Sequence, residues 1–159
     1  GHHWISAMPT NLYGPRDNFD LKTAHVLPAL IHRFHCAKVQ DDKSVSIWGD
    51  GTPLREFLYV EDLARACIIL MDRYDNSVAI NVGSGQEISI LNLAILVAKV
   101  VGFTGEITFD KNRPNGTPQK LLDNTLITQL DWHPQVSLEA GIASTYDWFS
   151  ANHKEEGIR

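Results

Sequence analysis

Residues Met8 to His25 read MPTNLYGPRDNFDLKTAH, and this stretch decides how the rest of the chain is interpreted. It contains two prolines, one glycine, two asparagines and two aspartates. Pro9 and Pro15 restrict their own φ angles and disfavour helix at the preceding residues, while Gly14 permits conformations that other residues avoid. We therefore expect a long irregular loop. Loops of this length are uncommon in compact domains unless they shape a site, although a plain surface connection is the alternative.

The composition favours one α/β domain in the cytoplasm. The chain has 159 residues, 43% of them hydrophobic, which is enough for a buried core. The net charge is −5 and no basic stripe follows an expected element, so we expect neither nucleic acid nor a membrane as partner. The longest apolar run, residues 66–71, is far shorter than a membrane-spanning helix. Cys36 and Cys67 lack metal-ligand spacing, so we expect reduced thiols and no metal site.

Helices and short strands alternate along the rest of the chain. The spacing of apolar residues predicts helices over 25–38, 62–71, 90–101 and 138–149, with Ser89 and Ser137 as N-caps and Gly102 as a left-handed C-cap. Short strands are predicted over 4–8, 44–48, 55–60, 78–82 and 107–109, with Val45 and Ile47 on one face of the second, and residues 110–120 are predicted to be irregular. The core face of the second helix is predicted to consist of Leu63, Ala64, Cys67, Ile68 and Met71. The pattern indicates a small mixed α/β unit and not a bundle or a sandwich.

Two motifs of dinucleotide-binding enzymes are missing from the sequence. No G-x-G-x-x-G or G-x-x-G-x-x-G turn joins a strand to a helix, so a dinucleotide pyrophosphate has no cradle. None of the four tyrosines is followed four residues later by lysine, so there is no Tyr-x-x-x-Lys motif either.

The string PTNLYGP, followed by DNF and HVLPAL, resembles the GDP-L-fucose synthase family. Its members are extended short-chain dehydrogenases/reductases that act on nucleotide sugars. The resemblance runs from about Ser6 to Phe149 and implies that residues 1–159 are the carboxy-terminal, substrate-binding domain of such an enzyme. The Rossmann-type NAD(P)-binding half would be largely absent, with residues 1–15 as its last part. The implied reaction converts GDP-4-keto-6-deoxy-D-mannose to GDP-L-fucose by 3,5-epimerisation and NADPH-dependent 4-reduction.

By this resemblance, the nicotinamide end of NADP would lie against Pro9, Thr10, Asn11 and Leu12. A loop that begins with proline would present backbone groups that no helix or sheet has paired. His25 would be the catalytic acid of the epimerisation and would also touch the cofactor. Imidazole titrates nearest to neutral pH, which suits repeated protonation of a sugar carbanion. Without the resemblance, a histidine before a helix is more often a cap or a surface residue.

Two further blocks imply contacts with the substrate. Arg33 lies two helical turns after His25 and is placed to meet a diphosphate. The string WGDGTPLREF (48–57) matches the family's WGxGxPxREF, in which Trp48 offers an apolar face and Arg55 a bidentate fork. Without the resemblance, these would be a core tryptophan and solvated arginines.

The last block, RPNGTPQK (113–120), departs from the family's usual KPDGTPRK. Asn115 replaces the aspartate that contacts substrate, and Gln119 replaces an arginine. Asparagine still forms hydrogen bonds but carries no charge. Lys120 is retained and is expected to neutralise a phosphate.

The resemblance implies a GDP-sugar as partner and a homodimer for the full-length enzyme, with the dimer interface mostly in the absent half. Because the glycine-rich turn and Tyr-x-x-x-Lys are missing, we expect the chain alone to be inactive. Exposed apolar surface is expected where the cofactor half would dock. Two alternatives stay open: another nucleotide-sugar epimerase or dehydratase, and a non-catalytic nucleotide-sugar-binding module.

Overall fold

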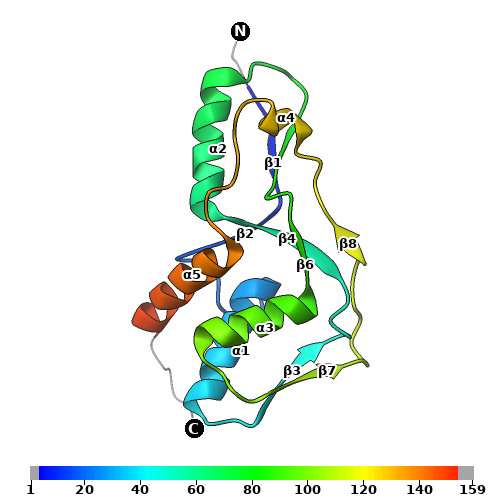
Figure 1. Cartoon of the computed structure of the whole chain (residues 1–159), viewed down its shortest axis with the longest axis vertical. Helices are drawn as coiled ribbons and strands as arrows, with labels where there is room; N and C mark the ends of the chain where they lie inside the picture. The colour runs from blue at the N-terminus through cyan, green and yellow to red at the C-terminus, as the bar shows by residue number, and fades with distance from the viewer. Residues whose placement is uncertain (1–3, 154–159) are drawn as a thin grey trace.

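The computed structural model describes residues 4–153 and has the mixed α/β architecture that the sequence predicts. The helices are α1 (Val26–Val39), α2 (Val60–Arg73), α3 (Ile90–Val101), α4 (Thr125–Thr128) and α5 (Leu138–Asn152). The strands are β1 (Ala7–Pro9), β2 (Asn11–Tyr13), β3 (Ser44–Trp48), β4 (Leu54–Tyr59), β5 (Ile80–Val82), β6 (Glu87–Ser89), β7 (Glu106–Asp110) and β8 (Gln119–Lys120). Figure 1 shows α2, α4 and β1 at one end of an elongated molecule and α1, α3, β3 and β7 at the other.

The strands pair mostly in parallel. Within the described part of the chain, β1 pairs with β5, β3 with β7, and β4 with both β2 and β8 in parallel, while β4 and β6 are antiparallel. Parallel neighbours need crossover connections, and helices α1, α2 and α3 lie in these connections. Strands β6 and β8 were not predicted, because they are only three and two residues long and are defined by their pairing with β4.

Strand β4 separates two hydrophobic clusters, since successive side chains of a strand point to opposite faces. Leu58 belongs to a cluster that α2 covers, together with Ala66, Leu70, Ile80 and Val82. Its neighbours Phe57 and Tyr59 belong to a second cluster, which draws on α1, α3 and α5. Side chains on the two faces of β4 therefore pack into different clusters, so this one short strand connects both ends of the molecule.

The stretch 8–25 is more regular than predicted. It contains part of β1 and the whole of β2, and the chain passes from one sheet to the other at Thr10, whose N–H donates to Val82 O at 3.0 Å. Proline is tolerated at Pro9 because strand β1 pairs on one side only within the described residues. Residues 14–25 form the expected loop, and Phe19 anchors it by packing against Phe149 with ring centroids 4.6 Å apart.

Helix α2 turns a different face to the core from the one predicted. Of the expected core residues, only Leu63 is partly buried and packed. The buried positions are instead Asp62, Ala66 and Leu70, four residues apart. The rest of the predicted face is exposed and is called the exposed stripe below: Ala64, Cys67, Ile68 and Met71. Apolar residues cover most of this helix's circumference, so their spacing alone did not choose the buried side.

Several helix ends follow the sequence directly. Helix α1 begins close to His25, as predicted, and His25 is its N-cap residue without a capping hydrogen bond from the side chain. Ser89 Oγ accepts a hydrogen bond from the N–H of Asn92 at 3.1 Å at the start of α3, and Gly102 ends that helix with φ 79°. The predicted cap Ser137 likewise begins α5.

Candidate functional site

Four of the five residues predicted to bind substrate line one cleft of about 350 Å³. The cleft lies where α1, β3 and β4 meet the loops before α1 and β8. We call it the basic cleft, and its lining is Leu21, Lys22, Ala24, Val26, Ala29, Leu30, Arg33, Ile47, Trp48, Arg55, Ile90, Pro114 and Asn115. Segments more than ninety residues apart in the sequence thus form one site.

Helical and strand periodicity explain how these side chains converge. Val26, Ala29, Leu30 and Arg33 are spaced by three, four and seven residues, so they share one face of α1. On β3, Val45 and Ile47 are buried, as predicted, whereas Trp48 at the end of the strand is 57% exposed. The indole therefore remains available at the cleft.

The cleft is cationic. Its charged lining residues are Lys22, Arg33 and Arg55, and no acidic residue lines it. The guanidinium carbons of Arg33 and Arg113 lie 5.6 Å and 5.0 Å from the ring centroid of Trp48. An aromatic face beside several guanidinium groups suits a ligand that combines a flat base with phosphate oxygens.

The glycine turn that follows Trp48 is held by a distant loop, which contributes Asn115 to the lining of the cleft. Gly49 adopts φ 83°, and a Cβ there would overlap the side-chain oxygen of Asn115. That oxygen accepts a hydrogen bond from the N–H of Asp50 at 2.8 Å. Hydrogen bonds from Thr52, and then one with Asn115, lower the pKa of Asp50 to about 2. The amide oxygen of Asn115, predicted for substrate, is thus engaged within the protein.

Lys120 is the predicted substrate residue that the basic cleft does not include. It is exposed and lies on β8, opposite Arg55 in the pairing of β8 with β4. The sequence block 113–120 therefore runs past the cleft, and only its first part lines the wall. A phosphate contact for Lys120 stays a prediction.

None of the predicted catalytic and cofactor residues lines the cleft, and of these only His25 adjoins lining residues in the sequence. His25 is exposed and stands between the lining residues Ala24 and Val26. Pro9 ends β1, and Asn11 and Leu12 belong to β2, so the expectation of an unpaired backbone was wrong for these residues. Strand pairing uses backbone N–H and C=O groups that were expected to be unpaired.

Thr10 also uses its side chain within the protein, as Asn11 does. Thr10 Oγ1 and Asn11 Nδ2 donate to the carbonyl oxygen of Glu56 at 3.2 Å and 2.7 Å. The roles of His25 and of residues 9–12 towards a cofactor stay predictions.

Sequence reasoning did not single out Lys22 and Ile90 of the cleft lining, or Arg113, which lies against Trp48. Lys22 and Arg113 lie inside the first and last sequence blocks, where their charge was the available signal. Ile90 opens α3 and lines the cleft, but an apolar residue at a helix start carries no functional signal. Its position depends on how α3 packs against α1.

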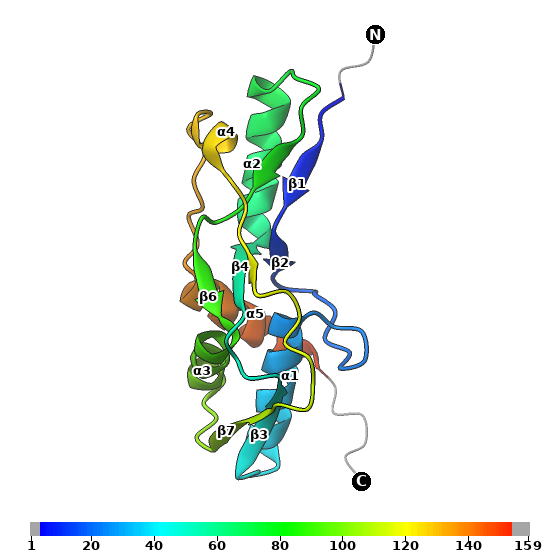
Figure 2. The same cartoon turned by 90° about the vertical axis from the view of Figure 1, so that its right-hand side faces the viewer.

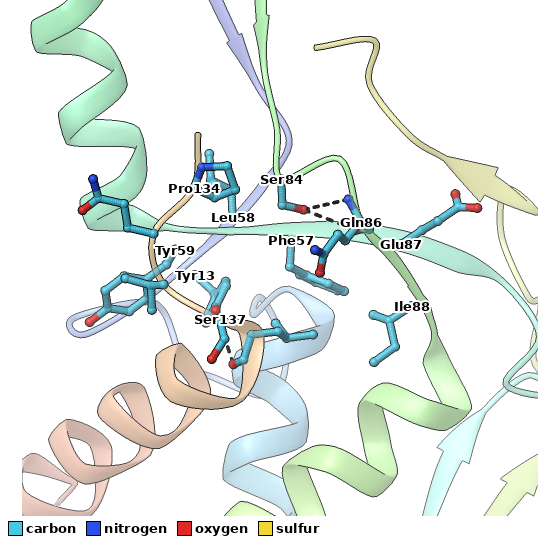
Figure 3. Close-up of a pocket in the computed structure, with 13 residues that line it drawn as sticks. Tyr13, Phe57, Leu58, Tyr59, Ser84, Gln86, Glu87, Ile88, Pro134 and Ser137 are labelled. Carbon is cyan, nitrogen blue, oxygen red and sulfur yellow. Dashed lines mark hydrogen bonds between the residues drawn. The ribbon is translucent and has the colours of Figure 1, made fainter. Parts of the chain in front are cut away.

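A second cavity, of about 410 Å³, lies between β4, β6 and residues 134–138 (Figure 3). Tyr13, Phe57 and Ile88 line it, and Glu87 is its one charged lining residue. Burial is the main cause that raises the pKa of Tyr13 above its usual range. A lining with one carboxylate and no cation does not suit a phosphate, so this cavity is a poorer candidate than the basic cleft.

Residues 4–153 contain neither a metal-ligand cluster nor a membrane-spanning helix. No group of three or more histidine, cysteine, aspartate or glutamate side chains in this range is placed to hold a metal ion. Within the same range, no helix combines the length and the apolar character needed to cross a lipid bilayer.

The parallel α/β fold, with its cationic cleft, can now be assigned to a class of protein. The chain belongs to the NAD dependent epimerase/dehydratase family, whose model matches residues 1–83. Within this class it is a homologue of GDP-L-fucose synthase. It is 54% identical over 153 residues to GDP-L-fucose synthase 1 of Arabidopsis thaliana, a match that covers 95% of this chain and 47% of that protein.

Two other relatives agree. The chain is 50% identical over 161 residues to GDP-L-fucose synthase of Escherichia coli (strain K12), which covers 96% of this chain and 50% of that one. It superimposes on a GDP-L-fucose synthetase from Naegleria fowleri bound to NADP with a TM-score of 0.87, 34% identity and coverage of 93% and 47%. The chain thus spans about half the length of the curated relatives it matches.

Proposed function

We propose that this chain is the GDP-sugar-binding portion of an enzyme of the GDP-L-fucose synthase type. The observation that carries the proposal is the convergence of Arg33, Trp48, Arg55 and Asn115 on one cleft without an acidic lining residue. In this assignment the arginines and Lys22 hold the diphosphate, and the indole packs against the base or sugar. The reaction of the whole enzyme would be 3,5-epimerisation of GDP-4-keto-6-deoxy-D-mannose followed by 4-reduction with NADPH.

His25 is assigned as the acid that protonates the sugar carbon during epimerisation. Its exposed position next to the cleft-lining residues Ala24 and Val26 supports this assignment. A base in the remainder of the enzyme would take the proton from the substrate carbon, and an imidazolium at this place would give a proton to the resulting carbanion. The base would then release its proton to water and the imidazole would take one up. Lys120, opposite Arg55 on β8, is assigned a supporting contact with phosphate.

The hydride for the reduction would come from NADPH, which this chain cannot hold alone. The sequence has no glycine-rich turn for the pyrophosphate, and Thr10 and Asn11 direct their side chains to Glu56 O. Binding of NADP is therefore assigned mainly to the remainder of a longer protein, with residues 9–12 at its nicotinamide end. The isolated chain is expected to bind a GDP-sugar without turnover.

Calorimetric titration of the 159-residue chain with GDP, UDP and dTDP tests the proposal. We expect GDP to bind most tightly, and Arg55→Ala to weaken its affinity about 10- to 100-fold, as for a lost charge-assisted hydrogen bond. Lys99→Ala is the matched control, because that exposed cation pairs with Glu139 away from the cleft. Equal or tighter binding of UDP or dTDP would favour another nucleotide-sugar epimerase or dehydratase, and no binding would overturn the assignment.

A non-catalytic nucleotide-sugar-binding module is separated from the enzyme by a second measurement. The chain would be mixed with the other half of a GDP-L-fucose synthase, and consumption of NADPH with the keto-sugar would be followed. Activity that depends on His25 supports the enzyme, whereas GDP binding without activity in every such pairing supports the binding module.

A further inference from the structure

Glu56 is a buried charge that the site described above does not use, although it directly follows the cleft residue Arg55. Its side chain is fully buried, at 0% exposure. The carboxylate accepts hydrogen bonds from the N–H groups of Gly85 at 2.7 Å and Leu122 at 3.1 Å, and from Asn124 Nδ2 at 3.4 Å. A buried carboxylate needs such donors, because leaving water is otherwise unfavourable. The side chain thus ties β4 to two distant segments.

The backbone of the same residue makes a second set of contacts. Its carbonyl oxygen accepts from Asn11 Nδ2 at 2.7 Å and from Thr10 Oγ1 at 3.2 Å. These are two of the residues assigned to the nicotinamide end of the cofactor. Glu56 therefore stands between that segment and the basic cleft.

Gly83 leaves the space that the Glu56 carboxylate occupies. A Cβ atom at Gly83 would overlap Glu56 Oε1 and would lie 2.9 Å from Asn124 Nδ2. The absence of a side chain at position 83 thus lets the carboxylate reach its donors. Because these donors come from two segments, the carboxylate holds β4 firmly in place relative to both of them.

Arg55 and Glu56 are consecutive on a strand, so their side chains point to opposite faces. A ligand that draws Arg55 into the cleft would pull on β4. Because the Glu56 carboxylate holds that strand rigid, the pull would reach Asn11 through the Glu56 carbonyl and would not be absorbed by β4. We propose that Glu56 is a positioning residue that couples occupation of the basic cleft to the Thr10–Asn11 segment. This inference rests on the proposed binding of a GDP-sugar in the cleft.

Asp62 provides the comparison that separates coupling from plain structural support. It too is fully buried, and it accepts from the N–H groups of Gln135 at 2.8 Å and Val136 at 3.1 Å. It also pairs with Arg65. These contacts fasten α2 to a segment outside the basic cleft, so loss of Asp62 lowers stability without touching the route from Arg55 to Asn11.

Nuclear magnetic resonance of the ¹⁵N-labelled 159-residue chain tests the coupling with GDP as probe. In the parent, we expect the Arg55 Nε–H and Asn11 Nδ2 resonances to shift with the same apparent Kd. In Glu56→Gln, the Arg55 resonance still reports binding, whereas the Asn11 shift at saturation falls by more than half. Asp62→Asn keeps the parent's Asn11 response. A silent Asn11 in the parent, or an unchanged response in Glu56→Gln, overturns the proposal.

A ligand-free experiment keeps this test separate from the proposed function. Arg55→Lys should move the Asn11 Nδ2 resonance in the parent background and not in Glu56→Gln. If GDP leaves Arg55 unshifted, the proposed function fails, while this comparison still decides the coupling. If Glu56→Gln does not fold, Gly83→Ala replaces it, because the added methyl group displaces the carboxylate and should move Asn11. An unmoved Asn11 resonance in Gly83→Ala overturns the proposal.

Discussion

The side-chain oxygen of Asn115 accepts a hydrogen bond from the backbone N–H of Asp50 at 2.8 Å. This bond joins residues 65 positions apart in the sequence and holds Asn115 in place at the lining of the basic cleft. The bond also explains how an uncharged asparagine side chain fits at position 115. The Asp50 carboxylate is an immediate neighbour, so a second carboxylate at position 115 would meet like charge.

Asn115→Asp is therefore expected to weaken GDP binding and lower the melting temperature. An aspartate would retain an acceptor for the Asp50 N–H, but it would add negative charge beside Asp50 in a cleft assigned to phosphate. Asp50→Asn in the same chain should restore part of the affinity, because it removes one of the two charges. Calorimetry with GDP measures both variants. An affinity in Asn115→Asp equal to the parent's would contradict this account of the pair.

The acid titration of Asp50 provides a second prediction. Its pKa is lowered from 3.8 to about 2, mainly by hydrogen bonds from Thr52, so the folded state favours the charged form. The contribution of these bonds is complete above about pH 3.8 and is lost as the pH falls through about 2. Carboxyl ¹³C titration should find Asp50 still ionised at pH 3. In Thr52→Val the titration should move up towards 3.8, and an unshifted midpoint in that variant would show that the turn does not stabilise the charge.

Gly141→Ala is expected to destabilise the fold by about 1–3 kcal/mol, as overpacking does. Alanine favours helix more than glycine, so any loss must come from packing. The added Cβ would overlap the hydroxyl oxygen of Tyr13 and lie 2.9 Å from its Cζ. Urea unfolding measures the change. Tyr13→Phe removes the overlapping oxygen and should recover part of the loss, whereas equal stability of Gly141→Ala and parent would show that the contact is not tight.

The exposed stripe of α2 predicts self-association of the isolated chain. Ile68 and Met71 are 63% and 74% exposed on a helix whose other apolar side is already buried. Figure 2 shows β1 at the same end of the molecule as α2, and β1 has no strand partner on its outer edge among residues 4–153. Exposed apolar side chains and an open strand edge both favour contact with other chains.

Ile68→Asp should therefore reduce concentration-dependent association in sedimentation velocity experiments. Ile95→Asp is the matched control, because Ile95 is also exposed, at 51%, but lies on α3. If both variants sediment like the parent, or the parent stays monomeric at every concentration, the stripe does not drive association.

Local sequence chemistry predicted most helices and their caps. Ser89, Gly102 and Ser137 mark helix ends through their own hydrogen bonds and backbone angles, which depend on few neighbours. Strand β3 was predicted with its correct bounds because its alternation between buried and exposed residues is regular. The cleft residues Arg33, Trp48, Arg55 and Asn115 were also predicted, because they lie in motifs that resemble those of the GDP-L-fucose synthase family.

Long-range packing decided what those local signals left open. The buried side of α2, the strands within residues 8–25 and the short strands β6 and β8 depend on partners that are distant in the sequence. The same holds for Glu56, whose donors come from segments that only the folded chain brings together. Backbone angles and caps are short-range properties, so residue order is enough to specify them. Burial and hydrogen-bond partners are long-range properties, and they exist only once the strands have paired and the helices have packed.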